Sequence, residues 1–104
     1  MRERDVEAYL VKAVRELGGE CRKVKWIGRR GAPDRLVMLP GTLWSPGGLF
    51  APILGLPARA VWVELKAPGV EPEDYQLREH ERMRAMGQRV VVIDSIEGVK
   101  ELLA

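Results

Sequence analysis

The stretch "VWVELKAPG", Val61 to Gly69, has the pattern of a strand with one apolar face. Apolar side chains occupy every second position from Val61 to Leu65, and side chains two residues apart share a face of a strand. The other face ends in a carboxylate, Glu64, and an ammonium, Lys66, just before Pro68 stops the strand. This charged pair is either a solvated strand end or a chemical site.

Composition limits the class of protein. A chain of 104 residues with 46% hydrophobic and 31% charged residues predicts one soluble globular domain spanning 1–104. No apolar run reaches the roughly 18 residues of a spanning helix, so we expect no membrane partner. The N-terminal segment lacks the features of a signal peptide, and the single cysteine, Cys21, cannot form an internal disulfide. Both observations favour a reducing, cytoplasmic location.

Scarce residue types exclude several chemistries. Because His80 is the only histidine and Cys21 the only cysteine, one chain cannot assemble a zinc finger or a multi-histidine metal site. The sequence has no G-x-S-x-G elbow, P-loop or G-x-G-x-x-G motif, which argues against the corresponding hydrolases and nucleotide-binding proteins. Carboxylates and cations remain abundant, and hard oxygen ligands suit Mg²⁺ or Mn²⁺.

Hydrophobic periodicity and turn signals predict an αβββαβα order. The expected elements are a helix at 3–17, strands at 20–27, 32–39 and 61–66, a helix at 73–86, a strand at 88–94 and a helix at 96–103. Short connections make the first three strands antiparallel, and the helical crossover makes the last two parallel. We therefore expect an α/β (α+β) fold with a mixed four-stranded sheet flanked by helices. The fourth strand is apolar throughout, which indicates burial on both faces.

Antiparallel pairing of 32–39 with 61–66 brings two carboxylates together. A register with Asp34 opposite Glu64 also places Leu39 opposite Arg59, so that the intervening residues loop out cleanly. Directly opposed side chains lie about 4.5 to 5.5 Å apart at Cβ. Two carboxylates at that distance repel each other, and a divalent cation is the usual remedy. Lys66 then lies at the edge of the ion, where its amine can orient or help deprotonate a water and stabilise charge on a phosphate.

Residues 40–59, "PGTLWSPGGLFAPILGLPAR", form an unusual insertion. It combines four prolines and four glycines with bulky apolar residues, and a loop this long and apolar needs a surface to cover it. It can fold back over its own core or form a contact between two copies of the chain. We favour the second, since a core of this size has little spare surface, and expect a homodimer through the insertion.

The net charge is only +2, but one segment is strongly basic. The candidate phosphate contacts are Lys23, Lys25, Arg29, Arg30 and Arg35. Such contacts steepen the salt dependence of nucleic-acid binding without discriminating between sequences. A solvated run of surface charge is the competing interpretation.

Three segments together resemble a known family. "GAPDRLV", "VWVELKAPG" and "YQLREHERMRAMGQRVVVI" are similar to the VRR-NUC family, a branch of the PD-(D/E)xK nucleases. The resemblance covers nearly the whole chain except 40–59. The family pattern of G-x-PD, E-x-K and a helical glutamine falls on Asp34, Glu64, Lys66 and Gln76, and a glutamate of the first helix falls on Glu7.

The resemblance implies a restriction-endonuclease-like αβββαβ core that hydrolyses DNA. It implies Mg²⁺ or Mn²⁺ held by Asp34, Glu64 and the backbone carbonyl of Leu65, with Lys66 as the catalytic amine. It further implies stand-alone dimers of bacterial or viral origin, active in the bacterial or infected host cell on branched DNA such as four-way junctions, with a role in DNA repair. One departure lies in the helix at 73–86, where the family usually has larger apolar residues than His80 and Arg84.

Two of the matched residues have more than one possible role. Glu7 lies at the edge of the apolar stripe of its helix, and is either a direct or water-mediated ligand or an ordinary charge at the helix rim. Gln76 either hydrogen-bonds the lysine, the water around the ion or the nucleic acid, or caps strand backbone. His80 we expect to be a partly buried structural residue.

Two functional hypotheses follow. The first is a metal-dependent endonuclease selective for branched DNA. The second is a catalytically silent module that binds DNA and dimerises through the same fold. Metal-dependent cleavage of branched DNA distinguishes the first from the second.

Overall fold

The computed structural model describes residues 1–41 and 57–104. Within these ranges the elements are α1 (Glu3–Glu16), β1 (Glu20–Lys23), β2 (Arg35–Leu39), β3 (Arg59–Leu65), α3 (Asp74–Ala85), β4 (Val90–Ile93) and α4 (Ile96–Leu103). They follow the predicted order and form the predicted α+β fold. No helix within the described ranges is long and apolar enough to cross a membrane. The greater part of the 40–59 insertion, and the dimer contact predicted for it, lie outside the described residues.

The four strands form a mixed sheet in the order β1-β2-β3-β4. β1 pairs antiparallel with β2, β2 pairs antiparallel with β3, and β3 pairs parallel with β4, as the sequence predicts. The predicted pairing of Leu39 with Arg59 is present. The insertion therefore leaves and re-enters the sheet between directly opposed residues.

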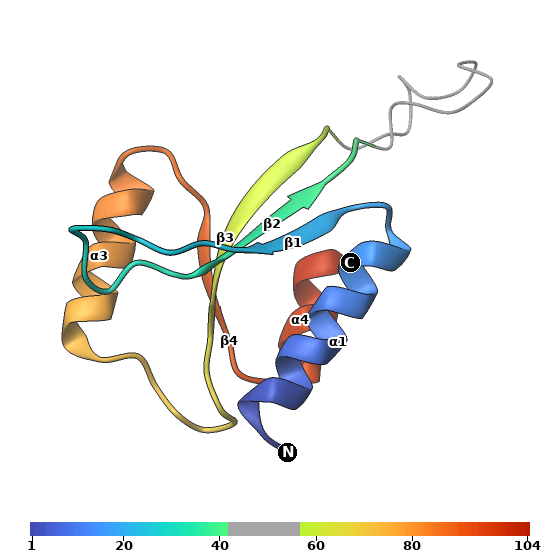
Figure 1. The fold of residues 1–104 in the computed structure, drawn as a ribbon, viewed down its shortest axis with the longest axis horizontal. Coiled ribbons are helices and arrows are strands. Elements are labelled where there is room, and N and C mark those ends of the chain that lie inside the picture. The colour runs from blue at the N-terminus through green and yellow to red at the C-terminus, as the bar shows by residue number, and fades with distance from the viewer. Residues whose placement is uncertain (42–56) are drawn as a thin grey trace.

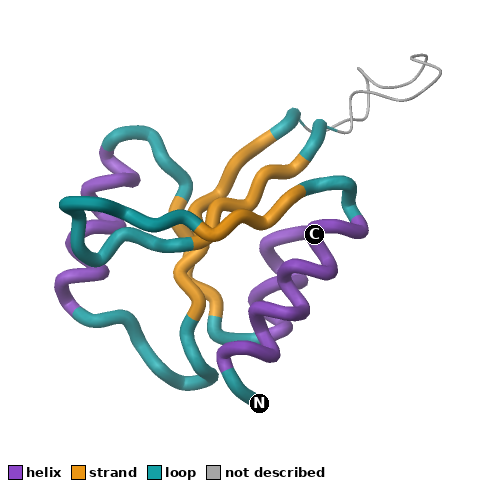
Figure 2. The backbone as a smooth tube through the Cα atoms, in the orientation of Figure 1, coloured by secondary structure: helices purple, strands orange, loops and turns teal. Residues whose placement is uncertain are grey.

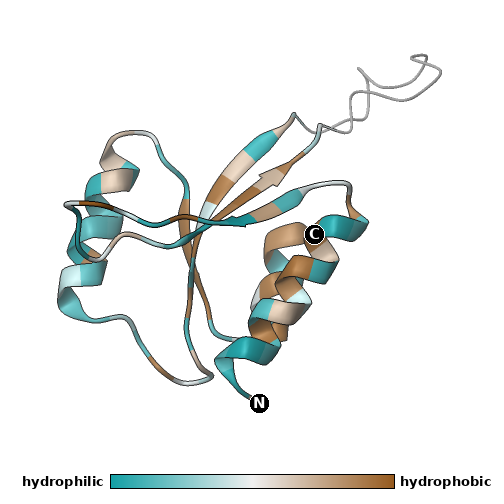
Figure 3. Cartoon of the chain, viewed as in Figure 1, coloured by the Kyte–Doolittle hydropathy of each residue, from teal (hydrophilic) through white to brown (hydrophobic). Residues whose placement is uncertain are grey.

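Helices cover both faces of the sheet. α1 and α4 lie side by side on one face, and α3 lies on the other (Figure 1). The main core lies under α1 and α4 and consists of Val6, Leu10, Val14, Val37, Leu39, Val61, Val63, Leu65, Ile93, Val99 and Leu102. Figure 3 shows the same asymmetry in hydropathy, with hydrophobic residues on α1 and α4 and a largely hydrophilic α3. Polar chemistry is therefore concentrated on the α3 side.

Local signals define the helix ends. The Asp5 carboxylate accepts a hydrogen bond from the backbone N–H of Arg2 at 2.7 Å, and Ser95 Oγ accepts one from the backbone N–H of Gly98 at 3.0 Å, which satisfies free donors at the starts of α1 and α4. After α1, a Cβ on Gly19 would meet the backbone oxygen of Met38 at 2.3 Å. Only glycine fits this close approach of the helix end to the sheet.

Two strand predictions need correction. The first strand ends at Lys23 rather than at residue 27, because the chain between 24 and 34 leaves the sheet and packs on α3. Figure 2 shows this long connection beside α3. The fourth strand is not buried on both faces, since β4 is an edge strand and Val92 is 36% exposed.

Polar and stacking contacts fasten the 24–34 connection to α3. Arg29 donates from Nε and Nη2 to the two carboxylate oxygens of Glu79, each at 2.8 Å. Arg30 stacks on the ring of Tyr75 at 3.8 Å. Gly31 has φ +86°, and a Cβ there would meet the backbone oxygen of Tyr75 at 2.9 Å. The position of α3 against the sheet is therefore coupled to the residues just before β2.

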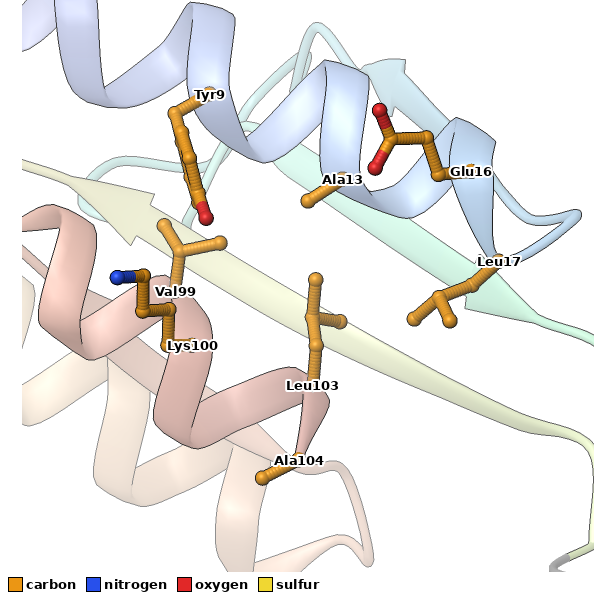
Figure 4. A pocket seen from close by; sticks show the side chains of 8 residues that line it. All are labelled: Tyr9, Ala13, Glu16, Leu17, Val99, Lys100, Leu103 and Ala104. Carbon is orange, nitrogen blue, oxygen red and sulfur yellow. The ribbon is translucent and has the colours of Figure 1, made fainter.

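A separate apolar groove lies between the outer surfaces of α1 and α4. Figure 4 shows its lining, which is Tyr9, Ala13, Glu16, Leu17, Val99, Lys100, Leu103 and Ala104. None of these is a predicted site residue. The groove is on the face of the sheet opposite α3.

Candidate functional site

The start of β2 and the end of β3 meet at one end of the sheet. The ladder pairs Leu39 with Arg59 and continues to Arg35 opposite Val63. One further step brings Asp34, immediately before β2, opposite Glu64. Because alternate residues of β2 and β3 fill the core under α1 and α4, Asp34 and Glu64 share the opposite face, which α3 covers.

Glu64 is a buried carboxylate with few contacts that stabilise its negative charge. Its residue is 8% exposed, and burial raises its pKa to about 7 from the usual 4.5, while the neighbouring Lys66 acts in the opposite direction. Asp34 raises the pKa further because two negative charges repel each other. Within the described residues Glu64 Oε1 is buried and has no hydrogen-bond partner. A positive charge between the two carboxylates would relieve both penalties.

Lys66 extends the same face by one position. Its backbone N–H donates to the carbonyl of Ile93 at 3.0 Å, so the pairing of β3 with β4 continues past Leu65 and fixes the backbone beneath the lysine. Its ammonium is close enough to be the largest favourable charge acting on Glu64. The Glu64-x-Lys66 spacing thus places an amine beside the carboxylate pair.

Arg35 is buried and paired rather than free. Its residue is 7% exposed, and its guanidinium lies 2.6 Å from Glu7 Oε2 and 3.1 Å from Asp34 Oδ1. Glu7 therefore contacts Asp34 through the guanidinium, from the α1 side of the sheet. This geometry favours the rim-charge interpretation of Glu7, and it leaves the charge of Arg35 neutralised by carboxylates instead of facing solvent.

The remaining predicted residues lie on β1, the 24–34 connection and α3. Lys23, Lys25, Arg29 and Arg30 are exposed on β1 and the 24–34 connection, although Arg29 is paired with Glu79. Gln76 is in the first turn of α3, and its Oε1 accepts the backbone N–H of Glu73 at 2.8 Å. The amide oxygen of Gln76 therefore caps its own helix and not the backbone of a strand.

His80, predicted to be a partly buried structural residue, contacts the site directly. It is fully buried, and its Nε2 lies 3.4 Å from Glu64 Oε1. Burial lowers the pKa of the imidazole, and Arg84 lowers it further. A histidine on a helix carries no local signal of a contact with a strand 16 positions earlier, so only the tertiary structure reveals it.

The carboxylate pair suits a hard divalent cation. Across residues 1–41 and 57–104, no three His, Cys, Asp or Glu side chains gather closely enough to hold a metal by themselves. Mg²⁺, however, is usually held by one or two carboxylates and keeps several waters. The burial of Glu64 and the repulsion between its carboxylate and that of Asp34 fit such a site. The donor set contains no thiolate and no free imidazole pair, so it does not suit zinc.

An αβββαβ order with an aspartate before the second strand and E-x-K at the end of the third is the arrangement of the PD-(D/E)xK nucleases. No protein-family model matches the chain. A curated relative, "Putative nuclease p44" of Acyrthosiphon pisum secondary endosymbiont phage 1, is 43% identical over 95 residues, which cover 91% of this chain and 85% of that protein. A solved structure described as "VRR_NUC domain" matches with a TM-score of 0.71 and 36% identity, over 97% of this chain and 92% of its own.

Both relatives match nearly the full length of the chain. The chain therefore belongs to the VRR-NUC family of nucleases. The resemblance stated from the sequence motifs is confirmed, and so is the fold that it implied.

Proposed function

We propose that this chain is a divalent-metal-dependent endonuclease that hydrolyses phosphodiester bonds in DNA. The observation that carries the proposal is the register of β2 and β3, which sets Asp34 opposite Glu64 with Lys66 next on the same face. Membership of the VRR-NUC nucleases supports the reaction class. Residues 1–104 act as one catalytic domain, with 40–59 as an insertion.

Asp34, Glu64 and the backbone carbonyl of Leu65 would hold Mg²⁺ or Mn²⁺. When bound, such an ion supplies Lewis-acid stabilisation of phosphate charge and lowers the pKa of water. The side chain of Asp34 is 48% exposed, so this ligand faces the side from which substrate approaches. Glu64 is buried and is the ligand on the protein side. Leu65 follows Glu64 directly in β3, and its buried side chain anchors the carbonyl.

Lys66 is the residue that acts on the substrate. Its ammonium lies beside Glu64 on the α3 face, where it would orient the attacking water and donate to the phosphate oxygens as negative charge develops there. Arg35 and Glu7 do not contact the substrate and act through Asp34. By pairing with Asp34 Oδ1 at 3.1 Å, the guanidinium fixes the rotamer of that carboxylate. Gln76 is a candidate for contact with water or nucleic acid through its amide nitrogen, since its oxygen caps α3.

DNA would approach along β1 and the 24–34 connection. Lys23, Lys25 and Arg30 are exposed there, and the side chain of Arg29 is 42% exposed despite its pairing. These cations would contact phosphates without reading the sequence. Arg35 does not belong to this set, because both of its guanidinium ends bind carboxylates.

The substrate we propose is branched DNA, such as four-way junctions arising in DNA repair. Two active sites in a homodimer can address two strands, and the apolar insertion at 40–59 offers a dimer contact by its composition. The single cysteine and the phage relative fit action in the cytoplasm of a bacterial host.

A cleavage assay on a panel of substrates tests the proposal. Purified protein would be incubated with four-way junctions, flaps, forks and plain duplex in Mg²⁺, Mn²⁺ or EDTA, with light scattering to measure its mass. We expect cleavage with either ion, none in EDTA, and preference for a branched substrate. Metal-independent DNA binding without cleavage under any ion would instead identify a silent DNA-binding module.

A further inference from the structure

The contact between His80 and Glu64 is unusual because both partners are buried and otherwise unpaired. His80 has no exposed surface and Glu64 is 8% exposed. In the described part of the chain, Glu64 Oε1 and both ring nitrogens of His80 form no hydrogen bond that meets standard geometry. Yet Nε2 and Oε1 lie only 3.4 Å apart. Buried polar atoms are nearly always hydrogen-bonded, and leaving them unpaired is costly.

A proton must lie between these two atoms. If neither atom carried a proton, two hydrogen-bond acceptors would face each other in a buried site, which is repulsive. When Glu64 is ionised, as a metal ligand must be, the proton is on Nε2. The ring then donates to Oε1, and a small rotation of either group from 3.4 Å completes the bond.

The helix that carries His80 is held firmly in place. On one side, Glu79 is bound by Arg29 of the 24–34 connection. On the other side, the Arg84 guanidinium donates to the carbonyl of Val90 at 2.8 Å and ties α3 to β4. An imidazole between these two anchors can hold its partner in a fixed orientation.

We propose that His80 is a positioning residue of the metal site, which donates from Nε2 to Glu64 Oε1 and so directs the other carboxylate oxygen toward the cation. This inference rests on the proposed function, because it gives Glu64 the role of ligand. Partners that orient metal ligands in this way typically contribute 10- to 100-fold to metal affinity.

A matched pair of substitutions separates this role from packing. Glutamine keeps an N–H donor near the position of the histidine Nε2, whereas methionine has a similar length and no donor. We expect His80→Gln to bind Mn²⁺ within about threefold of the wild type, and His80→Met to bind it about 10-fold more weakly. Mn²⁺ binding is measured by electron paramagnetic resonance on the full chain, and melting temperatures are recorded without metal. In a Glu64→Gln background, His80→Met should cause no further loss.

The single histidine of this chain allows a second, metal-free readout. In ¹⁵N-histidine-labelled protein, held at a pH well above the Glu64 pKa of about 7 so that this carboxylate is ionised, two-dimensional NMR should show one ring with the proton on Nε2 and none on Nδ1. A ring protonated on Nδ1 alone would overturn the proposal, and so would equal Mn²⁺ affinity of His80→Met and the wild type, or equal losses in both variants.

The outcomes also separate this proposal from the proposed function. If Glu64→Gln weakens Mn²⁺ binding but His80→Met does not, the metal site stands and the role of His80 is wrong. If Asp34→Asn and Glu64→Gln both bind Mn²⁺ as the wild type does, the assigned ligands are wrong and the positioning role is overturned with them.

Discussion

Arg35 and Glu7 form an ion pair, 2.6 Å between Nη2 and Oε2, that joins residues 28 positions apart. The same guanidinium lies 3.1 Å from Asp34 Oδ1. Glu7 is thereby connected to the proposed metal site through a buried cation. The pair also ties α1 to the start of β2, at the point where the site is assembled.

This relationship predicts a graded effect of Glu7→Gln. Without the carboxylate, Arg35 binds Asp34 alone and competes more strongly for it, so we expect a roughly 10-fold loss of cleavage. Asp34→Asn should cost far more, about 10³-fold or greater, because it removes a ligand. Glu16→Gln, at an exposed position at the other end of the same helix, is the control. Equal losses in Glu7→Gln and Asp34→Asn would identify Glu7 as a direct ligand.

Lys66→Ala should remove activity while the fold is retained. The side chain of Lys66 is half-buried at the end of the sheet and contributes little to the core, whereas loss of a group that stabilises developing charge costs about 10²- to 10³-fold in rate. Cleavage rates and circular dichroism are the measurements. Lys100→Ala, on the exposed face of α4, is the matched control. Full activity in Lys66→Ala would reject the assigned chemistry.

Two glycines with similar backbone angles test the attachment of the 24–34 connection to α3. Gly28 has φ +73° with open space around a Cβ, and Gly31 has φ +86° with Tyr75 O at 2.9 Å. We expect Gly28→Ala to cost only the left-handed strain, about 1 to 2 kcal/mol. Gly31→Ala should cost about 1 to 3 kcal/mol more, because overpacking adds to the strain. Urea denaturation measures both, and equal costs would show that the close contact with α3 is unimportant.

The raised pKa of Glu64 predicts a pH-dependent stability without metal. Because the folded-state pKa is about 7 against the usual 4.5, the folded chain holds a proton that the unfolded chain releases, so stability falls as pH rises from about 4.5 through 7. Glu64→Gln removes this penalty. In EDTA we expect the variant to gain up to about 3 kcal/mol over the wild type at pH 8 and little at pH 4.5.

Urea denaturation between pH 4.5 and pH 8 checks this expectation. Glu71→Gln, at an exposed position, should show no such gain. A difference between Glu64→Gln and the wild type that stays constant with pH would mean that Glu64 is ionised in the fold without cost.

Much of the fold was accessible from the sequence because its determinants are local. Alternation in β3 and the turn residues around the strands define the sheet, and the predicted register with Leu39 opposite Arg59 is observed. That register is also what sets Asp34 opposite Glu64. The motif and the topology point to the same site, which is why the family resemblance was sound.

The sequence could not reveal interactions between distant segments. In the sequence Arg35 has the pattern of a surface cation, but in the fold it is paired with Glu7 of α1. Beyond the end of the first strand, Arg29 is bound to Glu79, which is 50 positions away. His80 contacts Glu64 only because α3 is packed over the end of β3. These contacts depend on packing, which leaves no periodic signal in the chain.

The most direct test of the central claim is anomalous X-ray scattering from crystals of the full chain soaked in Mn²⁺. We expect a manganese peak between the carboxylates of Asp34 and Glu64, within bonding distance of both and of the Leu65 carbonyl oxygen. A manganese peak bound elsewhere, or no peak at this pair while the crystals remain ordered, would contradict the proposed site.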